Sequence, residues 1–161
     1  KHIAKQAIPE ALEKAVRYRL INEPTNAESI CLDVLDSDLN NQEALTVLIL
    51  ALTDQFNEDV SGNVAQARAL IERLDHEYER LYYEGIIHER RGKAILKKAF
   101  PGARYTAYDC FRTAMEYFEK AEAVHPTANE DATLRWNTCA RMIMDNNLQE
   151  QVDDSAQVML E

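Results

Sequence analysis

The chain has 161 residues, of which 46% are hydrophobic and 29% are charged, and its formal net charge is −10. This length suits one globular domain. The acidic balance argues against binding of nucleic acid by the whole surface, because phosphate contacts depend on Lys and Arg. Only four glycines and four prolines are present, too few for the tight turns of a β-sandwich or β-barrel. The composition therefore favours long helices.

The longest uninterrupted apolar run, Val47 to Leu52, is far shorter than the ~20 residues of a membrane-spanning helix. We therefore expect no membrane partner. Three cysteines are present, Cys31, Cys110 and Cys139. Their odd number and the absence of C-x-x-C spacing argue against a disulfide framework or a zinc knuckle. Reduced, buried thiols are typical of a cytoplasmic protein, and we expect a cytoplasmic location.

Apolar residues recur with a helical period along the first half of the chain. The pattern predicts a helix over Pro9–Ile21, a second helix after the turn at Glu23–Asn26, and a third helix over Ala44–Leu52 that is apolar almost all round. The stripe of the second helix has the spacing i, i+3, i+4, i+7, i+8: Ala27, Ile30, Cys31, Val34 and Leu35. We expect a loop over Asp59–Asn63. The stripe of a fourth helix follows it: Val64, Ala67, Ile71 and Leu74.

The second half predicts longer helices. Tyr78–Lys98 indicates one helix of about 30 Å, at 1.5 Å per residue, which Phe100-Pro101-Gly102 ends. Tyr105–Val124 indicates its antiparallel partner, and a final helix spans about Glu130–Asp145 with Trp136 in the core. The predicted fold is all-α, with about seven helices in antiparallel hairpins, one of them elongated. Residues 1–145 form a single domain in this prediction, and 146–161 form an acidic, flexible tail without Lys or Arg.

Four residues of the elongated hairpin form the pattern A-x3-F-x2-A followed by a proline: Ala114, Phe118, Ala121 and Pro126. This spacing resembles the second helix of the tetratricopeptide repeat, a helix-turn-helix unit of about 34 residues. Small alanines let two helices approach closely, and the phenylalanine fills the groove between them. Leu81 and Gly85 resemble the contact point of the first helix of such a unit.

The resemblance implies repeat units at about 8–41, 42–77 and 78–128, with a capping helix at 129–145. In the first unit Ala27, Cys31 and Val34 take the A, F and A places. The second unit is degenerate, and both helices of the third are lengthened into a protruding hairpin. Such units would stack as a right-handed superhelix. Its concave face, lined by the first helix of each unit, would bind a peptide or a partner helix without catalysis.

On this repeat register, several polar and aromatic side chains face the concave side. The arginines and an asparagine suit a peptide carboxylate or an acidic motif, and a tyrosine beside an isoleucine suits a partner anchor. The predicted partner-binding residues are Arg19, Tyr82, Ile86, Arg90, Asn137 and Arg141.

Residues 90–104 contain six bases and no acid, so the remaining residues must carry −16 for the total to be −10. The five of these bases that follow Arg90 form the predicted basic hairpin patch: Arg91, Lys93, Lys97, Lys98 and Arg104. Cations near the end of a helix complement its dipole, so the patch is either a solvated helix end or an interaction surface. Its partner would be nucleic-acid phosphate, an acidic protein, or the acidic tail of another copy of the chain.

Two pairs, Glu72/His76 and Glu84/His88, have i, i+4 spacing and could hold a metal if they faced one another. Surface helix pairs are the simpler interpretation, because di-metal helical bundles use i, i+3 spacing. No nucleophile motif or complete P-loop occurs. We therefore predict a non-enzymatic scaffold or adaptor that binds a protein or peptide, without a cofactor or metal. The alternatives are a nucleic-acid-associated protein that binds through residues 90–104 and a metal-dependent helical enzyme.

Overall fold

The computed structural model describes residues 1–57, 60–124 and 129–152, and no strand occurs among them. After a 3-10 turn at Lys5–Ala7, the described chain forms seven α-helices. They are α1 (Ile8–Leu20), α2 (Pro24–Ser37), α3 (Gln42–Asp54), α4 (Val60–Ile71), α5 (Glu77–Lys98), α6 (Ala103–Val124) and α7 (Asp131–Asp145). The all-α prediction is confirmed. Within the described residues, no helix is both long and apolar enough to cross a lipid bilayer.

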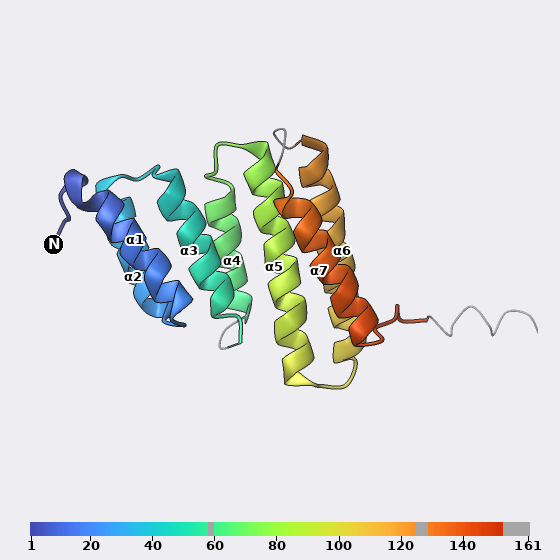
Figure 1. Cartoon of the computed structure of the whole chain (residues 1–161). Coiled ribbons are helices and arrows are strands. Elements are labelled where there is room, and N and C mark those ends of the chain that lie inside the picture. Colours follow the sequence, from blue (N-terminus) through green and yellow to red (C-terminus); the bar gives the residue numbers. More distant parts are fainter. Residues whose placement is uncertain (58–59, 125–128, 153–161) are drawn as a thin grey trace, which may run out of the picture.

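The helices pack in a row that runs from the α1–α2 hairpin to α6 and α7 (Figure 1). Each helix contacts the next helix in the chain. In addition, α1 contacts α3, and α3 contacts α5. An ion pair between Glu89 and Arg135 joins α5 to α7. The odd-numbered helices α1, α3, α5 and α7 are therefore linked directly to one another, and we call the surface that they share the odd-helix face.

Local sequence explains several helix ends. Pro9 and Pro24 lie in the first turns of α1 and α2, where a missing N–H costs no hydrogen bond. The Asn41 side chain caps α3 by accepting a hydrogen bond from the Ala44 N–H at 2.9 Å. Between α5 and α6, Ala99 (φ 48°) and Gly102 (φ 82°) adopt left-handed backbone conformations, which end α5 and reverse the chain.

Helix α4 begins earlier than the sequence pattern indicated. The predicted loop at Asp59–Asn63 is wrong for residues 60–63, which form the first turn of α4, while Asp59 lies outside the described residues. A glycine inside a helix costs only about 1 kcal/mol relative to alanine. Burial of Ala67 and Ile71, which are 0% and 5% exposed, outweighs that cost at Gly62.

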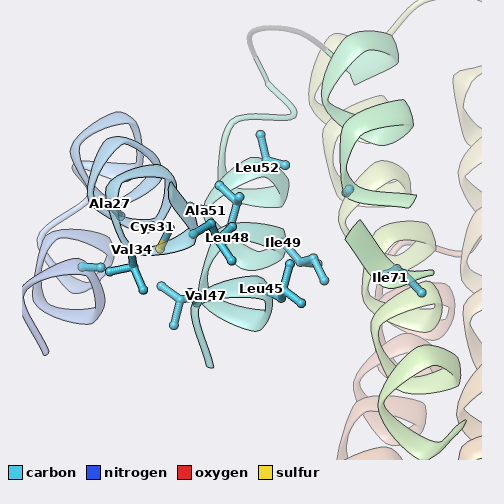
Figure 2. Packing of buried hydrophobic residues seen from close by; sticks show 14 of the residues in the cluster. Ala27, Cys31, Val34, Leu45, Val47, Leu48, Ile49, Ala51, Leu52 and Ile71 are labelled. Carbon is cyan, nitrogen blue, oxygen red and sulfur yellow. The ribbon is translucent and has the colours of Figure 1, made fainter. Parts of the chain in front are cut away.

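Two clusters of buried apolar side chains form the core, and α5 takes part in both. The first cluster lies among α1 to α5. In Figure 2, Leu48 of α3 points towards Cys31 of α2, whereas Leu45 and Ile49 project from the opposite side of α3. Ile87 and Ala94 of α5 belong to this cluster, whereas Ile86 and Ile95 belong to the second, among α5, α6 and α7. The core also buries the three free thiols, as the sequence predicted: Cys31, Cys110 and Cys139.

Helices α5 and α6 approach unusually closely. A Cβ placed on Gly85 would lie 2.5 Å from Cε1 of Phe118, and one on Gly92 would lie 3.0 Å from Cε1 of Phe111. Ala114, Phe118 and Ala121 are all 0% exposed. The close contact predicted from the small-residue and phenylalanine spacing is therefore present between these two helices.

Packing continues beyond the predicted domain boundary at residue 145. Leu148 is only 5% exposed and belongs to the second cluster. Arg104 Nη2 donates hydrogen bonds to the carbonyl oxygens of Asn146 and Asn147, which fixes the chain after α7 against the start of α6. Residues 153–161 of the predicted tail lie outside the described residues.

The Gly85 contact gives a stability prediction. Gly85→Ala removes the helix penalty of glycine but places a methyl carbon 2.5–2.9 Å from three ring carbons of Phe118, so we expect a net loss of about 2 kcal/mol in the free energy of unfolding. Urea denaturation followed by circular dichroism measures this. In the background of Phe118→Leu, which vacates the space, the same substitution should cost much less. An equal cost in both backgrounds would show that the two residues are not coupled.

Candidate partner-binding face

The first ion-pair cluster on the odd-helix face joins α1, α3 and α5. Asp54, at the end of α3, accepts a hydrogen bond from Arg19 Nε at 2.8 Å and another from Arg90 Nη1 at 2.6 Å. The three side chains are between 17% and 27% exposed, so solvent screens the charges only in part. One carboxylate thus holds two guanidiniums in fixed positions.

The second cluster joins α5 and α7 around a buried acid. Glu89 is 0% exposed and forms an ion pair with Lys93 Nζ, one turn along α5. Arg135 Nη1 lies 3.2 Å from Oε1 and 3.3 Å from Oε2 of the same carboxylate. Burial acts against the charge on Arg135, but Glu89 and then Tyr82 favour it, and the net effect raises the pKa of the guanidinium. A buried carboxylate needs such partners to stay ionised.

Together the two clusters form a belt of ion pairs across α1, α3, α5 and α7, which we call the cation belt. It contains two acids and four bases, a net charge of +2 in a protein of −10: Asp54, Glu89, Arg19, Arg90, Lys93 and Arg135. Arg19 and Arg90 each use one guanidinium nitrogen here, and neither side chain makes another hydrogen bond in the described part of the chain. Their remaining N–H groups suit an acidic ligand.

A cavity of about 600 Å³ lies at the N-terminal end of α5. We call it the tyrosine cavity. Its lining comes from the first turns of α5, the last residue of α6 and the start of α7, ends that meet at the upper edge of the molecule in Figure 1. The volume is within the range of small-ligand and side-chain pockets. The lining residues are His76, Glu77, Tyr78, Glu79, Tyr82, Tyr83, Val124, Asn129 and Asp131.

Three of the six predicted partner-binding residues lie in these features. Arg19 and Arg90 belong to the cation belt, each already paired with Asp54, and Tyr82 lines the tyrosine cavity. The prediction for Ile86 is wrong, because its side chain is 1% exposed in the second core cluster and has no surface to offer a partner.

Asn137 and Arg141 are not brought together with the others. At 100° per residue, Asn137 lies about 160° and Arg141 about 120° around α7 from Arg135, which is the residue that faces α5. Arg141 is exposed and Asn137 half-buried, and neither side chain forms a hydrogen bond or ion pair with the described residues. Both side chains lie outside the cation belt and outside the lining of the tyrosine cavity.

The structure disperses the predicted basic hairpin patch. Lys93 is part of the cation belt, and Arg104 binds the carbonyl groups that follow α7. The bases are close in sequence, but successive helical side chains point about 100° apart. Three members have neither an ion pair nor a side-chain hydrogen bond with the described residues. These are Arg91, half-buried beside His88 and Cys110, and the exposed Lys97 and Lys98.

The two Glu/His pairs do not meet. Arg68 of α4 contacts the second pair instead: its Nε is 3.2 Å from Glu84 Oε1, and its Nη2 is 3.2 Å from His88 Nε2. His88 also stacks on Tyr117, with ring centroids 5.5 Å apart. His76 is exposed, at the start of α5. Within the described residues there is no group of three or more His, Cys, Asp or Glu that could hold a metal ion.

Three residues of the cation belt escaped sequence reasoning: Asp54, Glu89 and Arg135. Asp54 ends a helix that is apolar almost all round, and nothing in the sequence distinguishes it from any other polar residue at the end of a helix. Glu89 and Lys93 have the i, i+4 spacing of a surface pair, and nothing in the sequence marks Glu89 as buried. Only the contact between α5 and α7 identifies Arg135 as its partner.

No protein-family model, curated protein or solved structure matches this chain. The resemblance to the tetratricopeptide repeat therefore stays a prediction from spacing, and the functional argument depends on the geometry of the chain itself.

The buried acid gives a second stability prediction. Glu89→Gln leaves Lys93 and Arg135 without their counter-charge, so we expect a loss of about 3 kcal/mol in the free energy of unfolding. Chemical denaturation at pH 7 measures it. The matched control is Glu116→Gln on the exposed surface of α6, which should change stability by less than about 0.5 kcal/mol. Similar effects of both substitutions would contradict a structural role for the cation belt.

His88 predicts a pH dependence of stability. Burial, followed by the charges of Arg68 and Arg91, lowers the pKa of His88 to about 4, below the value of ~6.5 for an unfolded histidine. Between these two pH values, His88 is therefore protonated in the unfolded chain and neutral in the folded chain. The contribution of neutral His88 to the free energy of unfolding is fully present above pH ~6.5. It is lost as the pH falls towards 4, and the loss is about 2 kcal/mol at pH 5.

Urea titrations at pH 7.5 and pH 5 test this, with His88→Gln as the variant and His76→Gln as the exposed control. The pH-dependent loss should shrink by about 2 kcal/mol in His88→Gln and persist in His76→Gln. An unchanged pH dependence in the His88 variant would assign the loss to other groups.

Proposed function

We propose that the protein is a non-catalytic scaffold or adaptor that binds a peptide or a partner helix along the odd-helix face. The observation that supports this most is the arrangement of the cation belt and the tyrosine cavity on α5. Tyr82 lines the cavity and interacts with Arg135 of the belt. An extended ligand could therefore contact both features at once.

The rigidity of the belt favours binding. Asp54 and Glu89 hold four cations in place before a ligand arrives, so little side-chain entropy remains to be lost on association. Fixed, half-buried guanidiniums are strong donors to carboxylates. The resemblance of the Ala114, Phe118 and Ala121 spacing to a tetratricopeptide repeat supports the same proposal, because that family binds peptides along its first helices.

The titratable groups favour binding over catalysis. Burial, the largest cause in each case, raises the pKa of the Cys31 and Cys139 thiols to about 12. Both therefore stay protonated near neutral pH, and a protonated thiol is a poor nucleophile. We further propose a cytoplasmic location, where buried free thiols remain reduced.

Nucleic-acid binding through residues 90–104 is the alternative function. Lys97 and Lys98 are exposed near two exposed aromatic residues, Phe100 and Tyr105, which are 45% and 44% exposed. Cations beside aromatic faces suit single-stranded nucleic acid. The dispersal of the other bases in this segment speaks against it.

Selection of a random displayed-peptide library against the full chain tests the proposed function. Affinities of the selected peptides are measured by fluorescence anisotropy for the wild type, for Arg19→Gln with Lys93→Gln, and for Lys97→Gln with Lys98→Gln. Both variants lose the same charge. We expect at least a tenfold loss of affinity in the first, because it removes two belt cations, and less than a twofold change in the second.

The opposite ranking would move the binding surface to the hairpin end. The alternative function would be supported if the wild type bound a single-stranded oligonucleotide in a salt-dependent way and the variant Lys97→Gln with Lys98→Gln did not. A library that yields no binding peptide would contradict the scaffold proposal.

A further inference from the structure

The tyrosine cavity has aromatic walls in a fixed arrangement. The rings of Tyr78 and Tyr82 stack with centroids 5.8 Å apart and 15° between their planes, and Tyr83 meets Tyr82 edge-on at 5.3 Å. The fully buried Phe118 supports Tyr82 from behind, at 5.9 Å. Aromatic faces carry negative charge density and attract cations within about 6 Å of the ring centre.

The hydroxyls of Tyr78 and Tyr83 stay neutral, so these two rings remain phenols. Burial, followed by the neighbouring Tyr82, raises the pKa of both Tyr78 and Tyr83 to about 12. The negative charge of the cavity therefore comes from its carboxylates and not from phenolate groups.

Three acids line the same cavity: Glu77, Glu79 and Asp131. No Lys or Arg occurs among the described residues that line it. Glu77 and Asp131 are exposed at the rim. Glu79 lies deeper, and its Oε2 atom is buried without a hydrogen-bond partner in the described residues. A buried acceptor without a hydrogen-bond partner is unfavourable.

These features select the class of ligand. A planar cation that donates several N–H groups can stack on a tyrosine face and bond a carboxylate at once, whereas an anion would meet three acids. We propose that the tyrosine cavity binds the guanidinium group of an arginine side chain, presented by the partner peptide. This inference rests on the proposed function, since it names the residue by which that partner is anchored.

The charge pattern along α5 then sets the orientation of the ligand. The acidic cavity lies at the beginning of α5, and the cation belt, with its net charge of +2, lies further along the same helix. A peptide that carries an arginine at one end and acidic residues at the other complements both features, with the arginine at the cavity and the acids at the belt. A uniformly acidic peptide would meet like charges at the cavity.

Nuclear magnetic resonance titration of the ¹⁵N-labelled full chain tests the proposal. The probes are short, capped Gly/Ser peptides that carry one central arginine, citrulline or glutamate. Citrulline has nearly the shape of arginine but no charge. We expect the arginine peptide to shift the amide signals of residues 76–83 and 129–132, with at least tenfold higher affinity than the citrulline peptide. The glutamate peptide should leave these signals unchanged.

Two variants locate the interaction. Glu79→Gln keeps the shape of the side chain and should weaken the arginine peptide about tenfold, whereas Glu116→Gln on the α6 surface should have no effect. Thermal melts establish that both variants are folded. Equal affinity for arginine and citrulline, shifts outside the cavity, or unchanged affinity in Glu79→Gln would each overturn the proposal.

The outcomes separate this inference from the proposed function. Library peptides that bind through the cation belt but contain no arginine would support the scaffold proposal. They would contradict the proposal that the tyrosine cavity binds an arginine side chain. An arginine probe that binds the cavity, together with a library that yields no peptide, would support a site for a guanidinium group and contradict the scaffold.

Discussion

Helix α5 must satisfy two hydrophobic cores and a polar face at the same time. Ile87 and Ala94 pack into the cluster shared with α1 to α4, and Ile86 and Ile95 pack into the cluster shared with α6 and α7. This is feasible because α6 lies very close, with the Phe118 ring filling the place that a side chain at Gly85 would need. The remaining side of the helix carries Glu89, Arg90 and Lys93 towards the neighbouring odd-numbered helices. A change in the α5–α6 distance would therefore move the core and the polar face together.

The charges on this polar face follow a repeated arrangement. Each of two acids is shared by two bases, Asp54 by Arg19 and Arg90, and Glu89 by Lys93 and Arg135. Ion pairs that are partly removed from water add little net stability over apolar packing, but breaking one is costly. Such clusters therefore fix the relative positions of the helices more than they strengthen the fold. They also concentrate positive charge at one place on an acidic protein, which is a basis for selecting a ligand.

Much of the fold could be predicted from the sequence, and the candidate site much less. The helical stripes located each helix to within a few residues, apart from the start of α4, where the turn-forming composition of Ser61, Gly62 and Asn63 masked a first helical turn. Tyr82 and two belt arginines were found because they fall on the first helices of the presumed repeats. Ile86 was misplaced, since the same argument cannot tell the side of α5 that faces α6 from the side that faces the odd-numbered helices.

The sequence by itself determined the helices and the close α5–α6 contact, because both depend on local rules: apolar periodicity, glycine and proline at helix ends, and small residues opposite a phenylalanine. Only the tertiary structure decided which charges pair and which remain free. Six bases between residues 90 and 104 look like one patch in the sequence, yet the structure separates them: Arg90 pairs with Asp54 of α3, Lys93 pairs with Glu89 within α5, and Arg104, on α6, binds the chain after α7. Long-range ion pairs and cavities arise from helices that meet in space, and no spacing within a single helix encodes them.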